Sequence, residues 1–306
     1  MRFRLVVFGI LFLVKTSIWA ENWPHWRGPT RDGVSREVNL PTKWNSTEPI
    51  VWKLPMPAWS GSTPIIWGDR IFLNSAEGGN RVAQRRGRRR RGPRTEGRRR
   101  DIQADYGMFG LNWGYASSPL LYNKMLYIQV LHGMKTDDPS YVLGIDALSG
   151  STQWRVERPT DALRESPDSH TTPAVLQYDG KTEIVVTGGD YATGHDPRTG
   201  EELWRAGGLN PSKTGNYRII ASPLVLEDIV YVPSRRNPLQ AFRGGGSGDV
   251  TESHRLWQTP NGPDVPTPVT DGKYLYILRD NGVMFLYEGQ NGPSCVGTRE
   301  STPWDL

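Results

Sequence analysis

The fold is indicated by the stretch Gly194-His195-Asp196-Pro197-Arg198-Thr199-Gly200, which is followed by Glu201 to Trp204. A β-prone segment enters a turn that begins with Asp196, and Gly200 takes the turn position that needs a positive φ. The next β-prone segment then delivers Trp204. The same pattern runs from Gly144 to Trp154, with Asp, Gly and Trp at equal spacing. The two copies predict a repeated pair of antiparallel strands.

A second motif, two small residues followed by proline, recurs five times along the chain. Its successive prolines are separated by 55, 54, 50 and 45 residues. Each copy precedes a few apolar residues, a tight turn and a β-prone run, which predicts a hairpin. The copies are Ser62-Thr63-Pro64, Ser117-Ser118-Pro119, Thr171-Thr172-Pro173, Ala221-Ser222-Pro223 and Pro266-Thr267-Pro268.

Together the motifs give four β-segments in each period of about 40 to 55 residues, which is typical of a β-propeller blade. We therefore expect an all-β fold, a β-propeller of four-stranded blades with about five repeats. Trp257 and Trp52 repeat the Trp-bearing strand, although a glycine-rich stretch over 243–253 stands where the turn before Trp257 is expected. The residues predicted to hold the repeats together are Trp52, Asp146, Gly150, Trp154, Asp196, Gly200, Trp204 and Trp257.

This succession of motifs resembles the PQQ-like repeat of quinoprotein-type propellers. That superfamily includes quinoprotein alcohol dehydrogenases and an outer-membrane assembly propeller. The opening Trp23-Pro24-His25-Trp26-Arg27-Gly28-Pro29, with Asp32-Gly33, is similar to the start of exported members, and the resemblance covers roughly 22–292. It implies a fold in which Gly and Trp join neighbouring blades. It does not imply a bound quinone, because many relatives look non-catalytic.

The N-terminus predicts export. Arg2 and Arg4 precede the apolar run Leu5 to Val14, and Ala20 is a small residue at the expected cleavage point. Ten apolar residues are fewer than the roughly 20 that span a bilayer, so a signal peptide over 1–20 is favoured over an uncleaved anchor. The protein is then expected in the periplasm or cell envelope, with an N-terminal arm and one blade strand over 21–60.

The C-terminus predicts an incomplete ring. Propeller repeats are expected over 61–292, after which a Val-Trp strand is due. The sequence instead gives Pro293-Ser294-Cys295-Val296-Gly297-Thr298, which we interpret as an aberrant tail over 293–306 from a frameshifted or prematurely ended gene. An open ring leaves unpaired sheet edges. Closure of a five-bladed ring through the strand of Trp52 is the alternative.

Positive charge is concentrated in one tract. The chain has 37 Lys and Arg against 32 Asp and Glu, a net charge of +5 and a pI near 9.3. Ten arginines and a single acid fall within Arg85–Arg100, and without this tract the net charge is −4. An Arg-rich insertion over 84–100 is expected to be a solvated loop. The alternative is capture of anionic lipid or acidic polysaccharide; nucleic acid is disfavoured, because no aromatic residue alternates with the arginines.

No motif in the sequence indicates catalysis. Cys295 is the single cysteine, which excludes an intrachain disulfide framework, and no two histidines stand at metal-ligand spacing. His170, Asp190 and Arg235-Arg236 are candidates to point into a central channel, although such residues more often serve strand ends. Asp146 and Asp196 are expected to cap their turns. The triple glycine Gly244-Gly245-Gly246 lacks the Lys and helix of a phosphate loop, so we expect a flexible connection.

These patterns favour an exported, non-catalytic interaction scaffold with a protein partner in the envelope and no cofactor. Repeat proteins readily supply a rigid surface of this kind. The alternative is a PQQ-dependent dehydrogenase, or an inactive fragment of one. It would need a calcium site of carboxylate and amide oxygens beside the quinone, and no aspartate here matches a catalytic position by motif.

Overall fold

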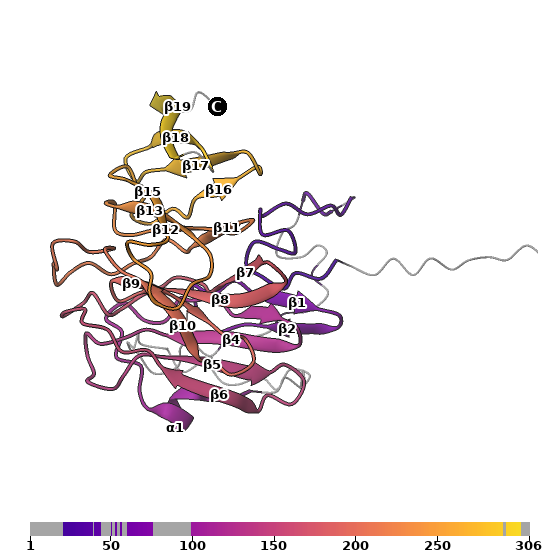
Figure 1. Ribbon diagram of the computed structural model, residues 1–306. Helices are drawn as coiled ribbons and strands as arrows, with labels where there is room; N and C mark the ends of the chain where they lie inside the picture. The colour runs from indigo at the N-terminus through magenta and orange to yellow at the C-terminus, as the bar shows by residue number, and fades with distance from the viewer. Residues whose placement is uncertain are drawn as a thin grey trace, which may run out of the picture.

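The computed structural model describes residues 21–38, 40–43, 50, 53, 56, 60–75 and 99–289, together with the backbone of 292–300. Its fold is almost entirely β, as the sequence predicts, and is built of successive sheets that follow the five repeats. Figure 1 shows the sheets stacked one after another from β3–β6 to β16–β19. Among the described residues, no strand of the first blade joins the sheet of the last blade, which agrees with an open arc.

The second and third blades contain the clearest copies of the repeat, and the first blade precedes them. The described part of the first blade is a hairpin, and the second and third blades are antiparallel meanders whose strands follow chain order. The strands are β1 (Ile65–Trp67) and β2 (Arg70–Phe72); β3 (Leu120–Tyr122), β4 (Met125–Val130), β5 (Tyr141–Asp146) and β6 (Thr152–Glu157); β7 (Ala174–Tyr178), β8 (Lys181–Gly188), β9 (Tyr191–His195) and β10 (Glu202–Ala206).

The fourth and fifth blades continue the same meander. Their strands are β11 (Leu224–Leu226), β12 (Ile229–Pro233), β13 (Leu239–Arg243) and β15 (Arg255–Thr259); β16 (Val269–Thr270), β17 (Tyr274–Leu278), β18 (Val283–Glu288) and β19 (Gly292–Glu300). The interpretation of 293–306 as an aberrant tail stays a prediction, although the backbone over 292–300 forms a strand. The backbone of β19 pairs with β18, from Glu288↔Gly292 to Val283↔Glu300, and completes the sheet. Backbone hydrogen bonding forms this strand without the expected Val-Trp sequence.

A row of backbone-to-hydroxyl hydrogen bonds links all five blades through the residue before each motif proline. The backbone N–H of Thr63 donates to the Ser118 hydroxyl at 2.9 Å, and the N–H of Ser118 donates to the Thr172 hydroxyl at 3.2 Å. Thr172 and Ser222 continue the row at 2.9 and 3.0 Å, the last bond ending on Thr267. We call these five residues the hydroxyl row. Their spacing explains why the motif places Ser or Thr before the proline.

Tryptophans close the contacts between neighbouring blades. Trp154 lies over Gly200 of the next blade, where a Cβ would approach within 2.4 Å of the indole, and its Nε1 donates to the Pro197 carbonyl at 3.2 Å. Within the third blade, Trp204 lies over Gly194, where a Cβ would come within 2.1 Å of Nε1. Such contacts require glycine, because no side chain fits beneath the ring.

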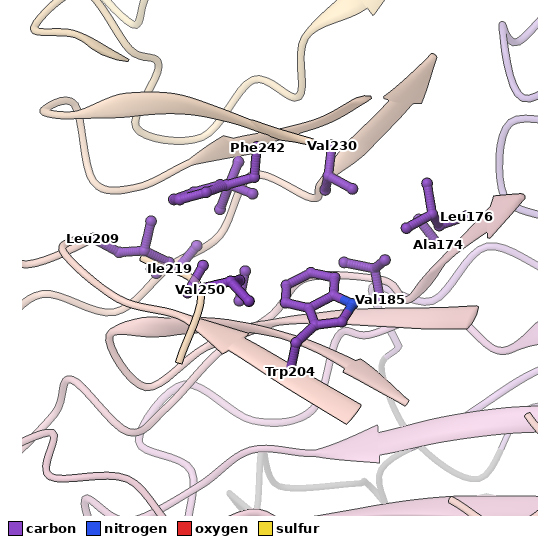
Figure 2. Close-up of a cluster of buried hydrophobic side chains, with 12 residues drawn as sticks. Ala174, Leu176, Val185, Trp204, Leu209, Ile219, Val230, Phe242 and Val250 are labelled. Carbon is purple, nitrogen blue, oxygen red and sulfur yellow. The ribbon is translucent and has the colours of Figure 1, made fainter. Parts of the chain in front are cut away.

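Trp204 lies at the centre of the interface between the third and fourth blades. Its side chain is 2% exposed and packs with Val230 and Phe242 of the fourth blade (Figure 2). Its Nε1 donates to the buried carboxylate of Glu183 at 2.6 Å. Trp257 occupies the corresponding position in the next interface, 5.8 Å from the ring of Tyr231. Trp52 lies outside the described residues.

The glycine-rich stretch before Trp257 differs from the expected flexible connection. It contains β14 (Gly248–Asp249), which pairs in parallel with β10 of the preceding blade, and Val250 behind it is buried. A Cβ on Gly244 would lie 2.7 Å from Leu176, so its backbone packs closely against the third blade. The glycine-rich stretch over 243–253 therefore joins the fourth blade to the outer strand of the third by backbone pairing.

The Arg-rich insertion lies outside the described residues except for Arg99 and Arg100. Arg100 forms an ion pair of 2.8 Å with Asp105 in α1 (Ile102–Tyr106) and donates to the Gly150 carbonyl at 2.8 Å. Asp101 begins this short helix by accepting from the backbone of Gln103. These contacts attach the C-terminal end of the tract to the second blade.

We expect the Thr172→Val substitution to destabilise the fold, because it keeps the side-chain volume but leaves the buried N–H of Ser118 without an acceptor. The expected loss is about 1 to 3 kcal/mol in the free energy of unfolding, measured by urea denaturation. The Thr172→Ser control keeps the hydroxyl and should lose much less. Equal stability of the two variants would show that the hydroxyl row does not stabilise the arc.

Replacing Trp204 with Ala should lower the free energy of unfolding by about 3 to 5 kcal/mol, because it empties the centre of an interface between blades. Trp113, which is 69% exposed, supplies the matched control, and its replacement by Ala should change stability by less than about 0.5 kcal/mol. A loss below about 1 kcal/mol at Trp204 would contradict the blade register.

Candidate functional site

The centre of the arc holds the N-terminal arm, which we define as residues 22–33. Trp23 exchanges two backbone hydrogen bonds of 2.8 Å with Ile66 and so extends the first blade. The carbonyl of Pro24 accepts from the N–H of Leu121 in β3 at 2.9 Å. The arm therefore covers the inner edges of the first two blades, which would otherwise present unpaired backbone groups.

Two arginines of the arm reach further blades. Arg27 donates to the carbonyl of Thr267 at 2.8 Å and also to that of Pro268, both in the fifth repeat. Arg31 donates to the carbonyl of Val175 in β7 at 2.7 Å. The arm thus contacts the first, second, third and fifth blades and joins the two ends of the arc.

Residues of the arm are buried and closely packed. His25 is 6% exposed, and burial together with the charges of Arg31 and Arg27 lowers its pKa to about 3. Burial also lowers the pKa of Arg27 to about 10. Gly28 has φ +77°, and a Cβ there would lie 2.7 Å from the ring of Trp23. The opening motif of the sequence therefore has a packing role at the centre of the arc.

The surface that remains accessible at one end of the blades is formed by the loops between second and third strands and between successive blades. We call this surface the loop face. The turns that begin with Asp146 and Asp196 lie at the opposite end, because strand direction alternates through each blade. The loop face is formed by residues 107–118, 131–140, 158–173, 188–190, 207–223, 234–238, 260–268 and 279–282.

An exposed tryptophan is held in place on the loop face. Glu165 accepts from the Trp113 Nε1 at 2.8 Å and from the Arg218 guanidinium at 2.9 Å. The guanidinium also lies 5.6 Å from the centre of the Trp113 ring. Because the carboxylate and the cation fix one indole between them, Trp113 is preorganised although 69% of its surface faces solvent.

His170 lies near this cluster. Burial, followed by the positive charge of Arg218, lowers its pKa to about 4, whereas Glu165 acts in the opposite direction. Neither ring nitrogen finds a hydrogen-bond partner among the described residues. The imidazole is therefore neutral at physiological pH.

Two of the cavities between described residues lie on the loop face. The larger, of about 450 Å³, lies between loops of the second, third and fourth repeats, and the smaller, of about 170 Å³, lies between loops of the fourth and fifth. The larger is lined by Met134, Arg164, Glu165, Thr214, Gly215 and Asn216. The smaller is lined by Arg236, Arg279, Asp280 and Asn281. Both have charged rims, which suit polar contacts with a partner.

Asp168 holds the loops around the larger cavity and has no motif in the sequence. Its fully buried carboxylate accepts three backbone hydrogen bonds, from Asn112 at 2.8 Å, Gly133 at 3.0 Å and Met134 at 3.1 Å. Burial raises its pKa, against the effect of these donors. Two loops distant in sequence are thereby bound to one side chain of a third.

The other candidates for a central channel do not gather in one site. Asp190 accepts from the Asn210 amide at 3.2 Å, and burial raises its pKa. Arg235 and Arg236 both form ion pairs with Asp264, at 3.5 and 3.3 Å. Asp190 and the arginine pair therefore serve separate loops of the third and fourth blades.

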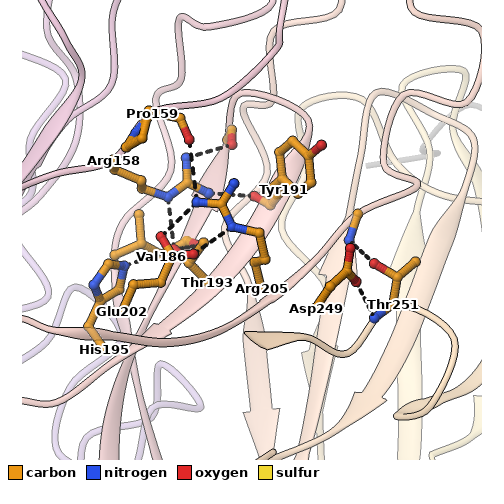
Figure 3. Close-up of polar contacts among 12 residues, drawn as sticks. Arg158, Pro159, Val186, Tyr191, Thr193, His195, Glu202, Arg205, Asp249 and Thr251 are labelled. Atoms are coloured by element: carbon orange, nitrogen blue, oxygen red, sulfur yellow. Dashed lines mark hydrogen bonds and ion pairs between the residues drawn. The ribbon is translucent and has the colours of Figure 1, made fainter. Parts of the chain in front are cut away.

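Arg158 is a buried cation that the sequence analysis did not identify. It is 1% exposed and donates to the Thr193 hydroxyl at 2.8 Å and to the carbonyls of Gly188 and Tyr191 at 2.9 and 2.8 Å (Figure 3). Burial lowers its pKa to about 10. Its contacts hold the hairpin that carries Asp190. The sequence analysis could not identify Arg158 because it lies in no motif.

The repeat aspartates cap turns at the opposite end of the blades. Asp146 accepts from the backbone of Ser149 at 2.7 Å, and Asp196 accepts from the backbone of Thr199 at 2.9 Å. The hydrogen bonds from Ser149 lower the pKa of Asp146. Gly150 follows its turn at φ +76°, as the repeat requires.

Within the described ranges, no group of three or more His, Cys, Asp or Glu side chains is arranged to hold a metal ion. The same part of the chain contains no helix of the length and hydropathy needed to cross a membrane.

We compared the chain with known protein sequences, structures and families. No curated protein sequence matches the chain. It is similar to the solved structure of BamB from Moraxella catarrhalis, with 16% identity and a TM-score of 0.34, over 61% of this chain and 64% of that one. It is also similar to the quinohemoprotein alcohol dehydrogenase of Comamonas testosteroni, with 13% identity and a TM-score of 0.47, over 62% of this chain and 35% of that one.

A third similar structure is a quinohemoprotein alcohol dehydrogenase from Pseudomonas putida, with 15% identity and a TM-score of 0.49, over 82% of this chain and 43% of that one. The chain thus spans less than two thirds of the length of each of these structures. A family profile described as outer membrane protein assembly factor BamB matches residues 110–294, more than half of the sequence. The chain therefore belongs to this family of PQQ-like repeat propellers.

Proposed function

We propose that the protein is a non-catalytic interaction scaffold of the cell envelope, exported by its N-terminal segment, which binds a protein partner through its loop face. The observation that carries the proposal is the preorganised Trp113, exposed between Glu165 and Arg218. Tryptophan and arginine dominate the energetics of protein interfaces, and a side chain already held in place loses little entropy on binding.

The surroundings of Trp113 support a protein partner. Apolar side chains accompany it on the loop face, and charged loops surround them, which matches the apolar core and polar rim of an interface. The centre of the arc is occupied by the arm, so the loop face is the surface that a partner reaches. The exposed apolar residues are Met108, Trp113, Met134, Leu163 and Val265.

The description of the matching family, an outer membrane protein assembly factor, names the kind of partner we propose, a protein that takes part in outer-membrane assembly. The proposal needs no cofactor. The Arg-rich insertion would then add attraction to anionic lipid or polysaccharide near the same membrane.

A photoreactive amino acid at position 113 should form a cross-link to an envelope protein in intact cells, because this position lies on the proposed contact surface. The matched control is position 148, where Leu148 is 56% exposed at the opposite end of the blades and should give no such product. Mass spectrometry of the product identifies the partner. Equal cross-linking at both positions would contradict a loop-face interface.

With the partner identified, Trp113→Ala should weaken its binding about 30-fold, since truncation of a central tryptophan costs about 2 kcal/mol. Leu148→Ala should leave the affinity unchanged. Uptake of PQQ with calcium by the purified protein, followed by dye reduction with an alcohol or a sugar, would instead support a dehydrogenase and overturn the scaffold.

A further inference from the structure

Each blade of the arc presents a forward sheet face to the following blade and a backward face to the preceding one. The contact between the fourth and fifth blades illustrates the arrangement. Trp257 and Tyr231 of the fourth blade pack against Leu275, Ile277 and Phe285 on the backward face of the fifth. Equivalent buried clusters join the other neighbouring blades. One type of interface, forward face on backward face, is therefore repeated along the chain.

The forward face of the fifth blade is apolar, and none of the described residues covers it. The strand register places Val269 opposite Tyr276 and Tyr276 opposite Leu286, so the three side chains lie on one face. Leu278 and Met284 are paired on the same face. Val269, Leu278 and Met284 are 40, 44 and 42% exposed, which is unusual for large apolar side chains grouped on one sheet.

The described hairpin of the first blade presents the matching backward face, which no other described residue covers. Ile65 and Phe72 are paired and pack toward the second blade, which leaves the neighbouring pair Ile66 and Ile71 on the other face. Ile66 is 37% and Ile71 is 43% exposed. One chain thus carries both halves of the interface that its own blades repeat.

The hydroxyl row ends in complementary groups at the same two blades. At each step an N–H of one blade donates to a hydroxyl of the next. Among the described residues, the hydroxyl of Thr63 accepts no such bond and the N–H of Thr267 donates none. A donor therefore stands at the forward end of the arc and an acceptor at the backward end.

We infer that the forward face of the fifth blade binds the backward face of the first blade in a second copy of this chain. The contact would continue the interface already present between the blades, with Thr267 of one copy donating to Thr63 of the other. Such a head-to-tail contact closes a two-chain ring if both ends engage and otherwise propagates. The partner is a second copy because each copy supplies both required faces.

The test places one charge on each face of the purified protein. Wild type should sediment as a dimer or larger species at about 100 μM, well above a micromolar dissociation constant. Met284→Glu disables the forward face and Ile71→Glu the backward face, so each variant alone should be monomeric. An equimolar mixture should form a dimer and nothing larger, because one intact interface remains between the two variants.

The mixture distinguishes this contact from a symmetric one, in which either the forward or the backward face binds its own copy. A symmetric contact would leave one of the two variants dimeric alone, and that result would overturn the inference. Leu148→Glu, on an exposed turn, is the matched control and should associate like wild type. Thermal unfolding of each variant confirms that it is folded. A folded wild-type monomer at about 100 μM would also overturn the inference.

Discussion

The hydroxyl row is the constraint on which the rest of the structure depends. Each blade contributes one Ser or Thr, and in the second, third and fourth blades this residue both donates its N–H to the next blade and accepts the N–H of the blade before with its hydroxyl. A backbone N–H buried between blades needs an acceptor, and a hydroxyl from the next blade supplies it only at one height and one rotation. The row therefore sets the register of the blades, and the tryptophans then fill the space that this register leaves.

The sequence predicted the blades well because their signals are local. The turn residues, the Trp that follows them and the small-small-Pro motif lie within single repeats, so period and spacing are enough to find them. The fold, the repeat count and the open arc agree with the structure. The strand over Gly292–Glu300 pairs with β18 through its backbone, without the Val-Trp pattern that the repeat predicts.

The site was harder to predict because its residues meet only through tertiary structure. Asp168 binds two distant loops through three backbone donors, which leaves no periodic pattern in the sequence. Trp113 stands outside the repeat and gains its fixed orientation from Glu165 and Arg218, both more than 50 residues later. The glycines over 244–246 suggested flexibility, whereas close packing against the third blade explains them. Glycine alone does not separate these two causes.

The long-range contacts of the arm constrain the order in which the parts of the fold form. Arg27 is among the first described residues to be synthesised, yet the carbonyls that it binds lie 240 and 241 residues later in the chain. Contacts of such long sequence separation form slowly, because the entropic cost of closing a large loop comes before any stabilising interaction forms. During synthesis the blades can assemble one after another, while the arm stays without its final partners until the fifth repeat has emerged. The arm, although it is made before the blades, is thus the last part of the described fold to complete its contacts.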